Sequence, residues 1–320
     1  MILLTKLGFG KYSDIFMVKE GNLSFAMKIS YYREENVRDF MEKMREGDVE
    51  SAKKIKDSDA ISVSARFSKI AKKMKEYNIT PHFINVYDSR DIKNFVEKIP
   101  LLASRLQELS PYQRKYNHVT FMELFDSDLT SFLLKKKYTD DFVRTCMFQV
   151  LYSIASTQLL ISGWRHNDLS TNNVLVKKSL KKTSSYDVNG KLFFTTSNHD
   201  IVIIDYDFVH AHTTKLDNHR VRSGNFRVSP EKNDSYDSHF FLKSVLKCIN
   251  KNTVSNIDAT KKFLHGLNLK ENDRYDKEIL ELHPLEILKH SYFDILKNVV
   301  IEPGKKYTMP PNISSSVQAP

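Results

Sequence analysis

The sequence predicts an α+β protein with a small, β-rich N-terminal part and a larger, mainly helical C-terminal part. Residues 3–30 alternate apolar and polar positions around two glycines, which is typical of short antiparallel strands. Beyond residue 126 the apolar residues recur three and four positions apart, which is typical of helices. A chain of 320 residues is also longer than a single hydrophobic core usually serves. We therefore expect one domain over residues 1–122 and a second over residues 123–300.

In the N-terminal part, two helical patterns follow the strands, over residues 37–44 and 63–74. Pro81 ends the second pattern, because the residue before a proline is forced out of the helical region. Short apolar runs then predict a strand over residues 83–87 and another over residues 118–124.

In the C-terminal part, residues 141–162 read as a long buried helix that ends at Gly163. Two short buried strands are expected at residues 174–176 and 201–204, on either side of a hairpin rich in lysine and serine. Residues 238–296 look helical. Residues 301–320 contain four prolines and little that can pack, so we expect a disordered C-terminal tail.

The composition narrows the class of protein. The chain has 41% hydrophobic and 28% charged residues and only two cysteines, which argues against a disordered chain and a disulfide framework. The longest apolar stretch, residues 148–164, is too short and too polar to span a membrane. No signal-peptide pattern opens the chain, so we expect a cytoplasmic protein.

The net charge of +10 suits an anionic partner, such as nucleic acid, a phospholipid surface or an acidic protein. The lysine clusters carry no interleaved aromatic residues and no zinc, helix-turn-helix or RNP pattern. The sequence therefore predicts no specific nucleic-acid site, and it leaves the oligomeric state open.

The strongest chemical signal is the segment from His166 to Asn173, which follows the long helix and leads into a strand. It places Asp168 two residues after the histidine and Asn173 five residues after the aspartate. At this spacing Asp168 can orient and deprotonate an acceptor hydroxyl, while Asn173 coordinates a metal that bridges phosphates. The pattern predicts a catalytic loop for phosphoryl transfer.

A second signal is the buried apolar strand over residues 201–204, which ends in Asp205. A carboxylate at this place is costly to leave unpaired. Mg²⁺ is a hard cation that takes one or two protein carboxylates together with phosphate oxygens. We expect Asp205 and Asn173 to bind Mg²⁺.

A third signal lies upstream, where Gly8 and Gly10 precede Lys28 by about 20 residues. Glycines let backbone N–H groups approach phosphates, and a lysine on the following strand can reach the α- and β-phosphates. We expect Gly8, Gly10 and Lys28 to bind ATP.

Together these segments resemble the eukaryotic-like protein kinases, from about Leu4 to about Leu296. The resemblance implies a two-lobed protein-kinase-like fold with ATP between the lobes and Mg²⁺ as the metal. Asp205-Tyr206-Asp207 is similar to the metal-binding Asp-Phe-Gly motif of that family. This variant and the helix over residues 147–152 look most like the divergent Ser/Thr protein kinases of large DNA viruses. The implied catalytic residues are Asp168, Lys28 and Asn173.

Some positions depart from the family pattern. Asn167 replaces the arginine that pairs with an activation-segment phosphate, so we expect activity without phosphorylation. Asp207 and Ser170 replace a glycine and a lysine, which allows reduced rates or altered acceptors. The acid that should pair with Lys28 is not identifiable, and Glu46 and Glu50 are the nearest substitutes. Further along, residues 229–231 look like the end of an activation segment, and Asp237 looks like the aspartate that braces the catalytic loop.

The main interpretation is a protein kinase that transfers the γ-phosphate of ATP to Ser or Thr. Residues 207–231 read as an open polar loop without helical period, which favours a protein acceptor; the preference over Tyr rests on family frequency. One alternative is a small-molecule kinase, because the same motifs resemble choline, ethanolamine and aminoglycoside kinases. The other is a pseudokinase that binds nucleotide without turnover.

Overall fold

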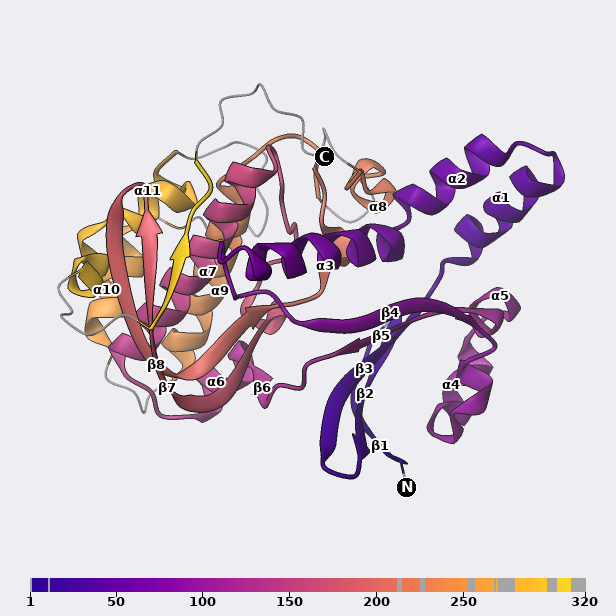
Figure 1. The fold of residues 1–320 in the computed structure, drawn as a ribbon, viewed down its shortest axis with the longest axis horizontal. Coiled ribbons are helices and arrows are strands. Elements are labelled where there is room, and N and C mark those ends of the chain that lie inside the picture. Colours follow the sequence, from indigo (N-terminus) through magenta and orange to yellow (C-terminus); the bar gives the residue numbers. More distant parts are fainter. Residues whose placement is uncertain are drawn as a thin grey trace. The chain divides into compact units, whose positions relative to one another are not determined.

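The computed structural model describes residues 2–10, 12–211, 215–224, 228–252, 257–267, 269, 280–297 and 304–311. The chain divides into two compact units, which Figure 1 draws together but does not place relative to one another. Unit 1 contains residues 1–68 and 84–124, and unit 2 contains residues 69–83 and 125–320. The structure is mixed α+β, with an antiparallel sheet in unit 1 and mainly helices in unit 2, which confirms the predicted fold class.

The described part of unit 1 forms a five-stranded antiparallel sheet in the order β1-β2-β3-β5-β4. Its apolar face carries Phe16, Met27, Ile29 and Val119, which are all buried. The alternation expected over residues 3–30 corresponds to the first three of these strands. The bounds are β1 (Ile2–Phe9), β2 (Ser13–Glu20), β3 (Leu23–Tyr31), β4 (Val86–Lys93) and β5 (Tyr116–Met122).

The helices of unit 1 fall between β3 and β4 and between β4 and β5 in the sequence. Asp48 caps α2 by accepting a hydrogen bond from the Ser51 N–H at 3.0 Å. A helical insertion between β4 and β5 adds Val96, Ile99 and Leu102 to the core of the sheet. The elements are α1 (Glu34–Arg45), α2 (Val49–Ser58), η1 (Val96–Lys98), η2 (Pro100–Leu102), α4 (Ala103–Glu108) and α5 (Pro111–Lys115), while α3 (Ala60–Glu76) runs from unit 1 into unit 2.

Unit 2 is built around α7 (Asp140–Leu160), which is buried on nearly every side. Thr139 caps its start, and Gly163 follows its end with a positive φ of 69°. No helix in the described ranges combines the length and the apolar character needed to cross a bilayer. The other helices and 3₁₀ turns are α6 (Leu129–Lys135), η3 (Thr171–Asn173), η4 (Tyr206–Phe208), α8 (His219–Arg222), α9 (Tyr236–Lys251), α10 (Asp258–Gly266), η5 (Leu280–Leu282), α11 (Pro284–Leu288) and η6 (Ser291–Lys297).

The sheet of unit 2 is a long hairpin of β7 (Val174–Val188) and β8 (Lys191–Ile203), joined at one edge by β6 (Ser127–Asp128). The predicted buried strands at residues 174–176 and 201–204 and the hairpin between them are therefore present, but both strands run on through the hairpin and are longer than predicted. The residues rich in lysine and serine pair with each other, apart from a bulge between Lys178 and Lys182. Most of these side chains between residues 177 and 184 are exposed or half-buried, so their polar composition is compatible with a strand.

The chain after residue 303 also forms a strand. β9 (Lys305–Thr308) pairs in parallel with β7, and Figure 1 draws it in yellow beside the hairpin. Tyr307 is 6% exposed and stacks on Tyr186 with ring centroids 5.3 Å apart. The expected disorder of residues 301–320 is therefore wrong for residues 304–311, because Tyr307 and Met309 are buried. The rest of that tail lies outside the described residues.

The strand expected over residues 83–87 is also displaced. β4 begins only at Val86, while Phe83 lies in unit 2 and forms a parallel bridge with Ile203. The Ile203 N–H donates to the His82 carbonyl at 2.8 Å. Residues 82 and 83 therefore support the end of β8, just before Asp205.

His82 gives this support a pH dependence. Its ring nitrogens bond the Ile201 carbonyl at 3.0 Å and the Tyr186 hydroxyl at 2.9 Å, and burial lowers its pKa from 6.5 to about 4. The unfolded chain then binds more protons between pH 4 and 6.5, so the fold loses stability as the pH falls through that range, by up to about 3 kcal/mol. Above pH 6.5 this histidine contributes no slope.

We expect His82→Gln to flatten the pH dependence of the free energy of unfolding between pH 7 and 5, measured by urea denaturation. His265→Gln is the matched control, because His265 is exposed on α10. An unchanged slope in His82→Gln would contradict the assignment.

Candidate active site

The structure brings Asp168 and Asn173 together in the loop after α7. The Asn173 Nδ2 donates to the Asp168 backbone carbonyl at 2.6 Å and to its Oδ2 at 3.1 Å. The Ser170 N–H donates to the Asp168 carbonyl at 2.9 Å, and the Asn173 N–H donates to the Ser170 carbonyl at 2.9 Å. The loop between the two predicted residues is thus closed by its own hydrogen bonds.

Asn173 also meets the strand that precedes Asp205. The Ile204 N–H donates to the Asn173 carbonyl at 2.9 Å, and Val174 lies opposite Ile203 in the ladder of β7 and β8. Because the side-chain nitrogen of Asn173 points to Asp168, its Oδ1 is the end left to accept. An amide oxygen and the carboxylate of Asp205 are ligand types that Mg²⁺ accepts.

Asp205 follows β8 in a left-handed conformation, with φ 63° and ψ 74°. Such a backbone costs an aspartate on the order of 1 kcal/mol or more, and it persists only where the surroundings hold it. The Tyr206 hydroxyl donates to the Ile203 carbonyl at 2.8 Å, and the His166 Nε2 bonds the Ile204 carbonyl at 2.9 Å. The residues on both sides of Asp205 are therefore held in place.

Asp237 on α9 braces the same loop, as the sequence suggested. Its carboxylate accepts from the His166 N–H at 2.6 Å and from the Asn167 N–H at 2.9 Å. Asp237 is fully buried, and burial raises its pKa. Both amides are buried as well, so without this carboxylate they would lack an acceptor.

We expect Asp237→Ala to lower the free energy of unfolding by about 2–5 kcal/mol, since two buried donors lose their partner. The melting temperature of the purified variant measures this loss. Asp258→Ala, at an exposed position in the first turn of α10, is the control and should change it little. Equal melting temperatures for wild type and Asp237→Ala would refute the brace.

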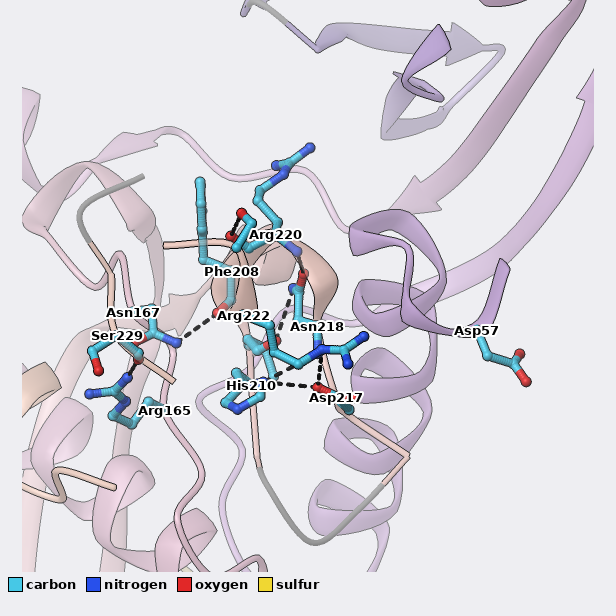
Figure 2. A network of polar contacts seen from close by, with 12 residues as sticks. Asp57, Arg165, Asn167, Phe208, His210, Asp217, Asn218, Arg220, Arg222 and Ser229 are labelled. Carbon is cyan, nitrogen blue, oxygen red and sulfur yellow. Dashed lines mark hydrogen bonds and ion pairs between the residues drawn. The ribbon is translucent and has the colours of Figure 1, made fainter. Parts of the chain in front are cut away.

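The segment beyond Asp205 is tied to the loop through Asn167, as Figure 2 shows. Asn167 Nδ2 donates to the Phe208 carbonyl at 2.9 Å. Asn218 is fully buried, and its Nδ2 donates to the carbonyls of Asp207 and Val209 at 3.0 Å each. Hydrogen bonds from the Asn167 and Asn218 side chains thus hold the backbone of residues 207–209 in place.

Two arginines complete this network. The Arg220 guanidinium lies over the Phe208 ring, 5.2 Å from its centroid, and its Nη1 is 3.9 Å from the Asp207 carboxylate. Arg222 pairs with Asp217 at 2.9 Å. Both arginines belong to α8, a helical turn in the region that the sequence suggested to be an open loop. Residues 212–214 and 225–227 of that region lie outside the described residues.

Sequence reasoning missed Arg165 and Asn218. Arg165 is 2% exposed, donates to the Ser229 carbonyl and lies 5.0 Å from the centroid of the Tyr236 ring. Its backbone also bonds His210 in both directions, at 2.9 and 3.0 Å. An arginine between a tryptophan and a histidine in a buried segment was the available signal. No sequence signal indicated Asn218, because its hydrogen-bond partners are backbone atoms.

The predicted phosphate-binding residues lie in unit 1. Lys28 is on β3 between Met27 and Ile29, which belong to the core, so it lies on the opposite face of the sheet. A Cβ at Gly8 would meet nothing within 4 Å, and one at Gly10 only Ser13 atoms at 3.6 and 3.9 Å. Neither glycine has a positive φ. The fold of unit 1 therefore does not itself require glycine there, whereas close approach to a ligand would.

Glu46 and Glu50 gain no support as partners of Lys28. Glu46 pairs with Lys43 at 2.7 Å, and Glu50 pairs with Lys54 at 2.8 Å. All four side chains are solvent-exposed on and beside α1 and α2.

The candidate residues thus fall into two groups, each described within its own unit. Unit 1 contributes Gly8, Gly10 and Lys28, and unit 2 contributes Asp168, Asn173 and Asp205. Within the described part of the chain, no group of three or more His, Cys, Asp or Glu side chains is placed to hold a metal ion. A metal held here would depend on the Asn173 amide, the Asp205 carboxylate and phosphate oxygens.

No family model matches the chain, and no curated protein matches it. Among solved structures, the chain is similar to the kinase domain of PF14_0431, with a TM-score of 0.37 and 12% identity. The match covers 67% of this chain and 52% of that one, so the chain spans about half the length of the solved structure.

Proposed function

We propose that the chain is an ATP- and Mg²⁺-dependent protein kinase that transfers the γ-phosphate to Ser or Thr hydroxyls. The observation that carries the proposal is the hydrogen-bonded pair of Asp168 and Asn173, joined through the Asn173 carbonyl to the strand that ends in Asp205. Phosphoryl transfer needs a base for the acceptor hydroxyl and oxygen ligands for the metal, held close to one another.

In this proposal Asp168 binds the acceptor hydroxyl and takes its proton as the hydroxyl oxygen attacks the γ-phosphorus. The bond from that phosphorus to the bridging oxygen breaks, and ADP leaves with the electron pair. Asn173 holds the Asp168 carboxylate in orientation through Nδ2. Mg²⁺, when held by Asp205 and Asn173, would neutralise charge on the phosphate oxygens. Lys28 would bind the α- and β-phosphates beside the backbone of Gly8 and Gly10.

A protein acceptor is proposed from the polar character of residues 207–231 and from the net charge of +10, which favours acidic proteins. The choice of Ser or Thr over Tyr, and the likeness to kinases of large DNA viruses in the cytoplasm or virion, remain proposals from sequence resemblance.

The acceptor is tested by incubating the purified chain with γ-labelled ATP and Mg²⁺, together with basic proteins, acidic proteins, choline or ethanolamine. Label on phosphoserine or phosphothreonine supports the proposal. Label on phosphotyrosine alone would overturn the Ser/Thr assignment. Label only on the small alcohols would identify a small-molecule kinase, and bound nucleotide without transfer would identify a pseudokinase.

We expect the activity not to depend on phosphorylation of the chain. Asn167 cannot offer a phosphate the two-pronged cationic contact of an arginine, and its amide already bonds the Phe208 carbonyl. Phosphatase treatment, verified by intact mass, should leave turnover within about twofold, because contacts between residues of the chain already hold the segment. A loss beyond tenfold that returns on rephosphorylation would contradict this expectation.

A further inference from the structure

The insertion between β4 and β5 reaches the turn that carries Gly10. Arg105 on α4 donates from Nη2 to the Gly10 carbonyl at 2.7 Å. The two residues are 95 positions apart in the sequence and belong to the same unit. The side chain of Arg105 is only 15% exposed, although Gly10 and the hydrogen bond to it lie at the surface.

The same guanidinium is anchored in a buried cluster. Its Nε lies 3.5 Å from the Oδ2 of Asp14, which is fully buried at the start of β2. The Tyr31 hydroxyl donates to that Oδ2 at 2.5 Å, and the Lys6 Nζ lies 3.5 Å from the other carboxylate oxygen. Arg105 also lies over the Tyr31 ring, 5.7 Å from its centroid. Contacts with buried residues of unit 1 therefore hold the Arg105 side chain in place.

Among the described residues, backbone pairing also shapes this turn, because Gly8 and Phe9 of β1 lie opposite Ile15 and Asp14 of β2. The Gly10 N–H donates to the Ser13 carbonyl at 2.7 Å, which closes the turn upon itself. A Cβ would find open space at Gly8 and nearly so at Gly10, so side-chain packing does not fix the backbone there. The bond to Gly10 is a charge-assisted contact from a rigid element, and such bonds are roughly twice as strong as neutral ones.

We propose that Arg105 is a positioning residue that sets the place of the Gly10 backbone and thereby the affinity for the phosphates of ATP. The nucleotide part of this proposal rests on the proposed function. The hydrogen bond between Arg105 and Gly10, called the brace below, does not rest on that function, because it joins only residues of unit 1. Arg105 bonds the Gly10 carbonyl while the Gly10 N–H donates to the Ser13 carbonyl, so both backbone polar groups of Gly10 are held in one arrangement.

Two variants separate the brace from the stability of the fold. Arg105→Lys keeps a cation for Asp14, but a single ammonium cannot span the carboxylate and the Gly10 carbonyl as a guanidinium fork does. The double variant Asp14→Asn with Arg105→Gln removes both charges together, so no buried charge is left alone. Glu108→Gln is the matched control, because Glu108 contacts Arg105 from an exposed position and leaves the bond to Gly10 in place.

Amide hydrogen exchange of a peptide covering residues 7–16 reads the brace without nucleotide. Both variants should exchange about tenfold faster there than wild type and Glu108→Gln. The dissociation constant for MgATP and its KM should rise about tenfold, while kcat at saturating ATP stays within about twofold, because Arg105 touches no reacting atom.

Unchanged exchange in folded Arg105→Lys would overturn the brace, and so would equal effects in Glu108→Gln. If Arg105→Lys does not fold, the double variant decides by the same readouts. Faster exchange with unchanged MgATP affinity would overturn the positioning role alone. If wild type binds no nucleotide while the variants still exchange faster, the proposed function fails and the brace stands.

Discussion

Asp168→Asn is expected to lower kcat by about 10²–10⁴-fold, the usual contribution of a positioned general base. The amide of asparagine cannot take the proton of the acceptor hydroxyl. Asn173 Nδ2 would still donate to the backbone carbonyl of residue 168, so the loop should keep its shape. The dissociation constant for MgATP should therefore stay within about threefold of wild type. Steady-state transfer of labelled phosphate and calorimetric titration measure the two quantities.

The control for this variant is Asp200→Asn on β8, where an exposed carboxylate pairs with Lys182. It removes the same charge outside the proposed site and should leave kcat unchanged. Loss of kcat in both variants would mean that net charge, not the base, matters. A wild-type kcat in Asp168→Asn would remove Asp168 from the mechanism.

Asp205→Asn is expected to lower turnover by about 10²–10³-fold and to weaken nucleotide binding only in the presence of Mg²⁺. Asparagine keeps the shape of the side chain and tolerates the left-handed backbone at this position. The substitution removes the negative charge that would bind the metal. Binding of ATP without metal should match wild type, since the phosphate contacts lie elsewhere.

The two variants should differ in their binding signature as well as in their rates. Titration of Mg²⁺ at fixed ATP should show a higher midpoint in Asp205→Asn and an ordinary one in Asp168→Asn. Full turnover in Asp205→Asn would be fatal to the metal assignment. A shared binding defect would instead indicate that both residues mainly stabilise the loop.

The sequence could predict features that depend on local pattern. The alternation over residues 3–30 and the glycine after α7 are such features, because strand and helix periods are written into neighbouring residues. The spacing of Asp168 and Asn173 predicted that one loop would bring them together, and the Asn173 Nδ2 donates to the Asp168 Oδ2 at 3.1 Å.

The local sequence patterns could not predict contacts between residues far apart in the chain. The sequence predicted the hairpin of β7 and β8 but not the length of its strands, and the parallel pairing of β9 with β7 depends on register and on a few aromatic contacts, such as Tyr307 on Tyr186. Asn218 and Arg105 act on backbone carbonyls distant in sequence, which no side-chain pattern records. The partners of Glu46 and Glu50 likewise depended on the course of α1 and α2.

The most direct test is whether purified wild-type protein moves the labelled γ-phosphate of ATP onto protein hydroxyls when Mg²⁺ is supplied. The account predicts label on Ser or Thr that disappears with EDTA and in Asp168→Asn, while Asp168→Asn still binds MgATP. Tight binding of MgATP by the wild type with no label on any acceptor, under conditions where a known kinase labels the same proteins, would contradict it.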